Sequence, residues 1–171
     1  MVDWDKTIWK IEDYIVEEVK RQGFRDPKNP ETKLRIRWMT EAWNWAQKQS
    51  NEFYKISVQD ILTIGHLVEQ DLNAQGFRRV NLTTGRYTWQ FATHTTIGID
   101  WHQIPRAIDN LVPGQDILEP EDWYKEFEEI HPFEDGNGRT GKILYTWLRK
   151  IQGYEDAFDK PIFPPAFWGR T

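Results

Sequence analysis

Apolar residues recur every three or four positions through most of the chain, which is the spacing of one face of an α-helix. The first such segment is predicted to begin after an Asp3 N-cap and to end at Gly23. Its apolar positions are Trp4, Ile8, Ile11, Ile15 and Val19. A second helix is predicted over residues 31–49, with apolar stripes on two opposite sides. We therefore expect it to lie at the centre of a bundle, and the alternative is that one stripe meets a partner.

Four more helices are predicted further along the chain. One begins at Ser57, where Asp60 completes a capping pattern, and continues to Gly76 with Leu72 on its buried side. The others are predicted over residues 101–112, 120–130 and from about 138 to 153. An extended, packed tail is expected at residues 161–165.

The periodicity changes to two between Phe77 and Phe91. Val80 and Leu82 alternate with polar residues, and alternation resumes over residues 87–91. Residues 83–86 are predicted to form the turn between these two strands. The chain is therefore expected to be mainly α, a helical bundle with one small β-hairpin.

Composition narrows the class of protein. The chain has 171 residues, of which 39% are hydrophobic and 29% charged, as is typical of one globular domain. A formal net charge of −5 argues against nucleic acid as a partner. The absence of cysteine excludes a disulfide framework, a thiolate metal site and a cysteine nucleophile. No apolar stretch is long enough for a membrane span and no signal-peptide pattern is present, so we expect a cytoplasmic protein without a membrane partner.

Residues that carry chemistry concentrate between the last two predicted helices. The segment reads His131-Pro132-Phe133-Glu134-Asp135-Gly136-Asn137-Gly138-Arg139-Thr140-Gly141-Lys142. Glycines that open a helix leave backbone N–H groups free to cradle a phosphate, and Arg139 and Lys142 add positive charge there. Asp135 is a hard oxygen ligand that suits Mg²⁺ beside such a cradle. His131 is placed to take a proton from an attacking hydroxyl.

Other interpretations of this segment fit it less well. Residues 136–141 match the dinucleotide-binding pattern G-x-G-x-x-G, but no apolar strand precedes them. The Walker pattern fails because Ile143 stands where a Mg²⁺-binding Ser or Thr is needed. A simple Asn-Gly turn between helices leaves the histidine, the acid and the two basic residues unexplained.

The segment resembles the signature of the Fic family, His-x-Phe-x-(Asp/Glu)-Gly-Asn-Gly-Arg-x-x-Arg, from His131 through Arg139. It departs from the family at Lys142, where the signature has a second arginine. The resemblance extends over residues 61–154, because the segment 76–79 followed by a hairpin is similar to the family's flap. It implies a single Fic-like domain over residues 1–171. The expected parts are N-terminal helices at 1–56, a Fic core at 57–154 with the motif at 131–142, and an extended C-terminal tail at 155–171.

The resemblance also implies an activity, protein adenylyl transfer (AMPylation), in which AMP moves from ATP to a Tyr, Thr or Ser hydroxyl of a target protein. His131 would be the general base, Phe133 the structural anchor of the motif, and Asp135 the ligand of Mg²⁺. The nucleotide would be bound by Gly136, Asn137, Gly138, Arg139 and Lys142. Family members that phosphorylate instead tend to have lysine at the position of Gly138, so this glycine favours AMP transfer.

Two alternatives remain open beside AMP transfer. One is a weakly active or inactive Fic-fold module that only binds a nucleotide or a partner, and Lys142 is the feature that supports it. The other is a phosphotransferase at the same site. Whether the enzyme transfers AMP or phosphate, the target protein is expected to dock along the hairpin 80–91 as an added strand.

Regulation is the last property that the resemblance addresses. Many Fic proteins are restrained by a helix with the pattern Ser/Thr-x-x-x-Glu, whose glutamate pairs with the second basic residue of the motif. No Ser or Thr of this chain has Glu four residues later. We therefore expect no such restraint within the chain, and instead a separate antitoxin-like inhibitor, as for toxin-like members, or a low intrinsic activity.

Overall fold

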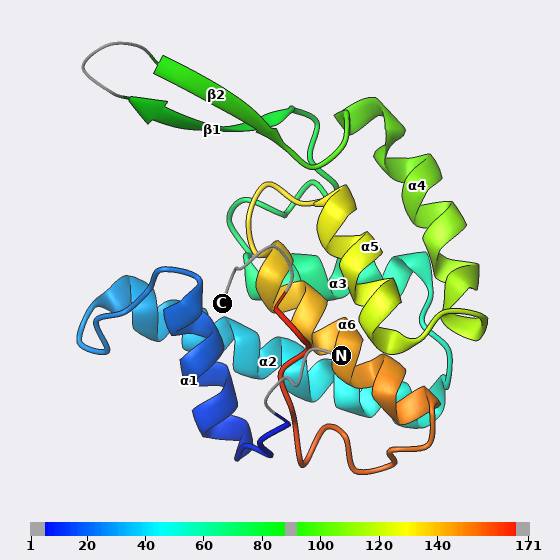
Figure 1. Ribbon diagram of the computed structural model, residues 1–171. Helices are drawn as coiled ribbons and strands as arrows, with labels where there is room; N and C mark the ends of the chain where they lie inside the picture. The colour runs from blue at the N-terminus through cyan, green and yellow to red at the C-terminus, as the bar shows by residue number, and fades with distance from the viewer. Residues whose placement is uncertain (1–5, 88–91, 167–171) are drawn as a thin grey trace.

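The computed structural model describes residues 6–87 and 92–166, and over residues 84–87 and 92–95 it describes the backbone alone. These residues form a helical bundle from which one antiparallel hairpin projects (Figure 1). The helices are α1 (Ile11–Arg21), α2 (Pro30–Glu52), α3 (Val58–Val68), α4 (Ile104–Leu111), α5 (Pro120–Ile130) and α6 (Asn137–Ile151). The strands are β1 (Leu82–Tyr87) and β2 (Ala92–Ile97), and short 3₁₀ helices η1 (Trp101–Gln103) and η2 (Val112–Asp116) flank α4. The predicted fold class is confirmed.

Helix α2 lies at the centre of one side of the bundle, against α1, α3 and α6. It begins where Asn29 caps the backbone N–H of Glu31 and Pro30 occupies the first turn. Its buried apolar side chains are Trp38, Met39, Ala42, Trp43 and Ala46. The polar residues between its apolar stripes are exposed, namely Lys33, Arg37, Glu41, Asn44 and Lys48. The prediction of a central bundle helix is therefore confirmed.

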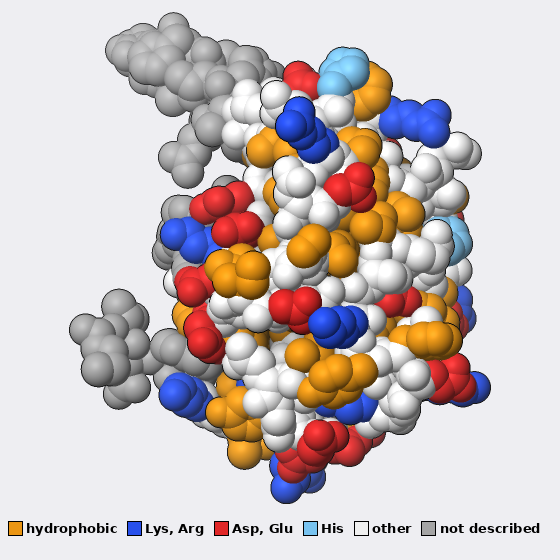
Figure 2. Space-filling model, turned by 90° about the vertical axis from the view of Figure 1, so that its right-hand side faces the viewer, with side chains coloured by type: hydrophobic (Ala, Val, Ile, Leu, Met, Phe, Trp, Pro, Cys, Tyr) orange, Lys and Arg blue, Asp and Glu red, His pale blue; other side chains and the backbone are white. Residues whose placement is uncertain are grey.

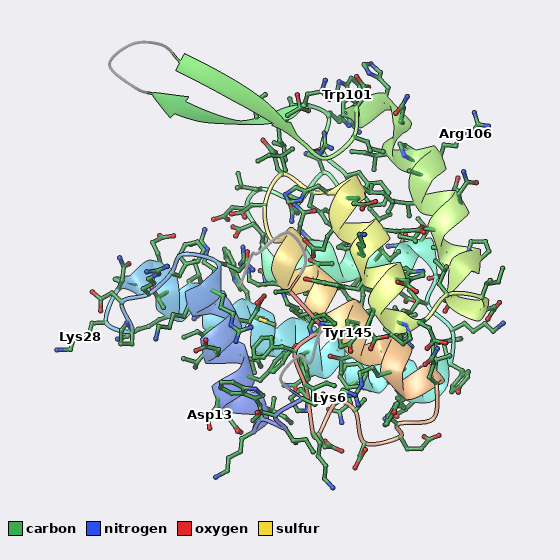
Figure 3. All side chains as sticks on the ribbon, viewed as in Figure 1. Lys6, Asp13, Lys28, Trp101, Arg106 and Tyr145 are labelled. Atoms are coloured by element: carbon green, nitrogen blue, oxygen red, sulfur yellow. The ribbon has the colours of Figure 1, made fainter. Side chains whose placement is uncertain are left out.

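Helix α6, which follows the motif, is enclosed by α2, α3 and α5. Ile143, Leu144 and Trp147 are fully buried on it, and Tyr145 lies inside the bundle whereas Lys28 and Asp13 point outward (Figure 3). The helix ends before Gly153, whose φ of 110° is easily adopted only by glycine. The rigid core of the molecule thus surrounds the helix that the motif opens.

The first helix starts later than the sequence predicts. α1 begins at Ile11 rather than after Asp3, a residue outside the described part of the chain. Residue Trp9 instead donates its backbone N–H to Pro161 O at 3.0 Å and packs edge-on against Phe163. Contacts with the C-terminal tail therefore replace helix formation in this segment. Phe163 of the tail is buried, as expected for a packed tail.

The helix that begins at Ser57 ends earlier than predicted. The capping box between Ser57 and Asp60 is present. The helix stops at Val68, however, and Leu72 is 48% exposed rather than buried. The amide of Asn73 donates to Gly65 O at 2.9 Å, which satisfies a carbonyl of the last turn and redirects the chain.

The hairpin is confirmed, but its predicted turn is wrong. Residues 83–86 lie within β1, and Gly85 pairs with His94 of β2. The predicted strand positions Trp89 and Phe91 lie outside the described residues. Thr83 and Thr84 are β-branched and favour a strand, which outweighs the turn tendency of one glycine.

Candidate active site

The motif loop joins α5 to α6, and His131 stands at the end of α5. Its backbone is left-handed, with φ 52° and ψ 64°, and it is the one non-glycine residue with positive φ in the described part of the chain. Such a conformation costs a non-glycine residue about 1–2 kcal/mol. Arg78 holds it in place, because its Nε donates to His131 O at 2.7 Å and its backbone N–H to Pro132 O at 2.9 Å. The imidazole is thereby set at the loop surface, partly exposed.

Phe133 lies in the core beneath this loop. It is fully buried against Phe77, with ring centroids 5.5 Å apart. Its ring occupies the space over Gly65 of α3, where a Cβ would collide with it. The ring of Phe133 thus packs directly against the backbone of Gly65, as a structural anchor of the motif would.

Asn137 closes the loop through its side chain. Its Oδ1 accepts from the backbone N–H of Phe133 and its Nδ2 donates to Phe133 O, both at 2.8 Å. Both ends of the amide are therefore used within the loop, and what Asn137 can offer a phosphate is its backbone N–H. The sequence does not distinguish these two uses of an asparagine in a glycine-rich turn.

The start of α6 presents a set of backbone N–H groups. Gly136 precedes the helix with φ 77°, and the first intrahelical bond runs from Thr140 N to Gly136 O. The N–H groups of Asn137, Gly138 and Arg139 come before that bond, so they are the ones a helix N-terminus offers to an anion. These three N–H groups can therefore donate hydrogen bonds to the oxygens of a bound phosphate.

Asp135 sits beside that set of N–H groups. Its side chain is 47% exposed, and its Oδ1 accepts from Gly136 N at 2.7 Å and lies 3.6 Å from Arg139 Nη2. A half-exposed carboxylate next to a phosphate cradle suits Mg²⁺, which takes one or two carboxylates together with substrate phosphates and water. No group of three His, Asp or Glu side chains that could hold a metal by itself occurs among the described residues.

Arg139 lies in a buried charge network rather than at the surface. Its side chain is 1% exposed, with Nη1 donating to Val68 O at 2.9 Å and Nη2 to Glu69 at 3.2 Å. Glu69, itself fully buried, also pairs with Arg35 of α2 at 3.1 Å. Two guanidinium groups thus share one carboxylate and connect the motif to α2 and α3. Sequence reasoning missed Glu69 and Arg35, because nothing in the pattern links residues so far apart.

Lys142 is paired with Glu18 of α1, and the sequence did not predict this contact. Its Nζ lies 3.2 Å from Glu18 Oε2, and Glu18 is fully buried. Burial lowers the pKa of Lys142, but attraction to Glu18, Tyr124 and Glu128 outweighs it, so the pKa is raised well above its ordinary value. The ammonium is therefore charged and already engaged.

Gln22, one turn after Glu18, extends the cover over the cradle. Its amide donates to Glu18 Oε2 at 3.2 Å and fills the space where a Cβ at Gly138 would lie. A glutamate therefore does contact the second basic position of the motif, although not one in the pattern Ser/Thr-x-x-x-Glu. Tyr14, not Ser or Thr, stands four residues before Glu18, so the pattern does not include this glutamate.

The remaining histidines form no site with this loop in the described part of the chain. His66 is exposed on α3, and His102 is exposed and lies 2.9 Å from Asp100. The side chain of His94 is outside the description. None of the helices in the described part of the chain is long and apolar enough to cross a membrane.

Comparisons with known proteins agree with this geometry. The model of the Fic/DOC family matches residues 55–148, more than half of the chain. A Fic domain containing signaling protein from Bacteroides thetaiotaomicron is similar in structure, with a TM-score of 0.67 and 13% identity over 85% of this chain and 68% of that chain. The comparison with curated proteins gives no match.

Two further solved structures share the fold. A Fic family protein from Desulfovibrio desulfuricans G20 has a TM-score of 0.60 and 18% identity over 86% of this chain. A portion of Fic-1 from C. elegans has a TM-score of 0.64 and 19% identity over 90% of this chain. The chain spans 48% and 50% of these two proteins, about half of their length. At these identities the similarity shows a common fold.

Proposed function

Because this chain belongs to the Fic/DOC family, we propose that it is a protein adenylyltransferase, which moves AMP from ATP to a hydroxyl of a target protein. The observation that carries the proposal is the juxtaposition at the motif loop. A histidine held in a left-handed conformation at the loop surface stands next to a helix N-terminus with available N–H groups. A base beside a phosphate cradle is what this transfer needs.

In the proposed reaction, His131 accepts the proton of the target hydroxyl. The hydroxyl oxygen then forms a bond to the α-phosphorus, and the bond from that phosphorus to the bridging oxygen breaks, so that pyrophosphate leaves. The N–H groups of residues 137–139 bind the phosphate oxygens and stabilise the charge that develops on them. Mg²⁺ held at Asp135 would supply further neutralisation of the phosphates when it is bound.

Gly138 supports AMP transfer over phosphorylation, because the phosphorylating branch tends to have lysine there. The Gln22 amide occupies the space above Gly138, so a larger side chain there would have to displace this amide. The competing candidate, a module that binds without transfer, is favoured by the engagement of Lys142 with Glu18.

We further propose that α1 restrains the enzyme. Glu18 holds the ammonium that would otherwise reach a terminal phosphate, and Gln22 lies over the start of α6. Breaking a buried ion pair by removing one partner typically costs about 3–5 kcal/mol. The contact joins α1 to the start of α6, and its release would free both Lys142 and the cradle.

The test is incubation of a Glu18→Ala variant with ATP labelled at the α- or the γ-phosphate, in the presence of a cell lysate. Label on protein from the α-phosphate alone supports AMP transfer. Label from the γ-phosphate alone would replace the proposal with phosphorylation. Absence of any label, from a variant that still binds ATP, would favour the binding module. Glu18→Ala/His131→Ala is the control, because it keeps the released cradle without the base.

A further inference from the structure

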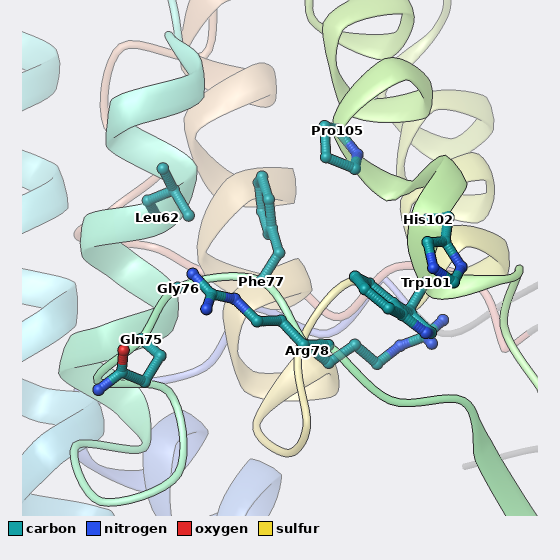
Figure 4. Close-up of a pocket in the computed structure, with 9 residues that line it drawn as sticks. Leu62, Gln75, Gly76, Phe77, Arg78, Trp101, His102 and Pro105 are labelled. Carbon is teal, nitrogen blue, oxygen red and sulfur yellow. The ribbon is translucent and has the colours of Figure 1, made fainter.

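A pocket of about 410 Å³ opens between α3, the segment before the hairpin and the start of α4 (Figure 4). Helix α4, whose first turn lines the pocket, lies on the opposite side of the molecule from α1 (Figure 1). Leu62, Phe77, Trp101 and Pro105 supply its apolar surface, and the other lining residues are Gln75, Gly76, Arg78, Arg79 and His102. Neither the family resemblance nor the proposed reaction uses this pocket.

The aromatic wall of the pocket is fixed by its neighbours. The ring of Trp101 stacks on that of His102, with centroids 3.6 Å apart, and its backbone N–H donates to Asn81 Oδ1 at 2.9 Å. Asp100 accepts from the backbone N–H of His102 at 2.9 Å and lies the same distance from its Nδ1. A wall that is ordered before binding reduces the entropic cost of receiving a ligand.

The charge around the pocket favours an anionic ligand. None of the nine lining residues is acidic, although the chain as a whole carries −5. The guanidinium of Arg78 is occupied by backbone carbonyls, including Val80 O and Ile99 O. Arg79 is exposed and remains to meet solvent or a ligand. Figure 2 shows His, Lys/Arg and Asp/Glu side chains next to hydrophobic ones at the top of this face, and the carboxylate at the edge of the pocket, Asp100, is engaged by His102.

The pocket is joined directly to the loop that holds His131. Arg78 lines the pocket and also donates to His131 O, so one residue separates the two. Asn81 and Asp100, at the roots of β1 and β2, are in hydrogen-bonding contact with Trp101 and His102 at its edge. The pocket therefore adjoins both the loop that holds His131 and the roots of the hairpin.

We propose that this pocket anchors the target protein by one bulky apolar side chain, flanked by Asp or Glu, on an extended segment. The apolar walls receive the side chain and Arg79 pairs with the flanking carboxylate. The inference rests on the proposed function in one respect, namely that the same segment brings a hydroxyl to His131. An adenine ring would also fit an aromatic wall, but it carries no charge to meet Arg79.

The experiment titrates the isotope-labelled full chain, without ATP, with blocked pentapeptides Gly-Asp-Phe-Asp-Gly. The readout is the indole N–H resonance of Trp101, assigned with Trp101→Phe. We expect this resonance to shift, and the peptide with Asn in place of both Asp to bind roughly two- to fivefold more weakly. The peptide with Ala in place of Phe should bind about tenfold more weakly or not measurably.

Charge reversal provides the sharper arm. Arg79→Glu should invert the preference, so that Gly-Lys-Phe-Lys-Gly binds more tightly than the Asp peptide. Arg37→Glu, on the exposed face of α2, is the matched control and should leave the preference unchanged. Equal binding of all peptides, or a larger shift of Trp101 with adenosine than with the Phe peptide, would overturn the proposal. Because no transfer is measured, failure of the proposed function leaves these results unaffected.

Discussion

The two sides of the motif loop differ in how deeply their charged and titratable side chains are buried. On the α1 side, Lys142 and Arg139 are buried and each is paired with a buried glutamate, Glu18 or Glu69. On the hairpin side, His131 is partly exposed and Asp135 is half-exposed. The same twelve-residue motif thus contributes to buried ion pairs on one side, the closed side, and presents solvent-accessible side chains on the other, the open side.

This difference separates residues that build the site from residues that act in it. The side chains of Phe133 and Asn137 hold the loop, one in the core and the other on the Phe133 backbone, and only the backbone N–H of Asn137 is proposed to act. The closed side also shows how the site could be controlled, because α1 contributes the glutamate that engages Lys142. A regulator needs only to compete for one ion pair and one glutamine.

The largest effect is expected from a variant that removes the proposed base, His131, on the open side alone. In a Glu18→Ala background, His131→Ala should lower AMP transfer by about 10²–10⁴-fold, the usual contribution of a general base. Nucleotide affinity should be nearly unchanged, since the imidazole acts on the target hydroxyl. Transfer rates and calorimetric titrations check this, and near-normal transfer by the variant would remove the assigned mechanism.

The next largest effect breaks the closed side. Arg139→Met should lower the free energy of unfolding by about 3–5 kcal/mol, because it leaves Val68 O and part of the Glu69 carboxylate without a buried partner. Denaturant unfolding followed by circular dichroism measures this loss. Arg35→Met provides the comparison from α2, since it removes the other partner of Glu69 without touching the motif. A loss below about 1 kcal/mol for Arg139→Met would contradict a structural role.

A smaller effect is expected from a variant that disturbs the contact between Gly65 and Phe133. Gly65→Ala should lower the free energy of unfolding by about 1–3 kcal/mol, because its Cβ collides with the buried ring of Phe133. Phe133→Leu in the same chain should relieve part of that collision. The double variant is therefore expected to lose less free energy of unfolding than the sum of the two single losses. Additive losses would show that this contact is not responsible.

The smallest effect sharpens the difference between the two sides. In a Glu18→Ala background, Lys142→Arg should raise the rate of AMP transfer about tenfold, because a guanidinium binds two phosphate oxygens and an ammonium binds as a point charge. In the chain with Glu18 present, the gain should be absent, since the new group would pair with the glutamate. An equal gain in both backgrounds would mean that Glu18 does not compete for this position.

Local signals predicted much of the fold, and long-range contacts account for its errors. The capping box at Ser57 and the glycine stop at Gly153 act within a few residues, and both hold in the structure. The predicted start of the first helix was wrong because the backbone N–H of Trp9 bonds to Pro161 O, which is distant in sequence. The early end of α3 likewise depends on Asn73, whose amide reaches Gly65 O.

The site divides in the same way. The motif named the residues of the loop, because a dense string of glycines, acids and bases is specific. It could not show that Arg139 shares Glu69 with Arg35, or that Glu18 pairs with Lys142, since each pair joins segments far apart in sequence. Such pairings depend on how the helices pack, which no single stretch of sequence specifies.

The central claim is that α1 restrains a nucleotide site at the start of α6, and calorimetric titration with Mg²⁺-ATP tests it most directly. Glu18→Gln keeps the size of the side chain but removes the charge that holds Lys142. Glu17→Gln is the matched control, because the neighbouring Glu17 pairs with Arg21 on α1 and not with the motif. We expect Glu18→Gln to bind ATP at least about tenfold more tightly than the parent chain, which is roughly 1.4 kcal/mol, and Glu17→Gln to bind as the parent does. Equal affinity of all three proteins, each with the fold retained, would contradict the account.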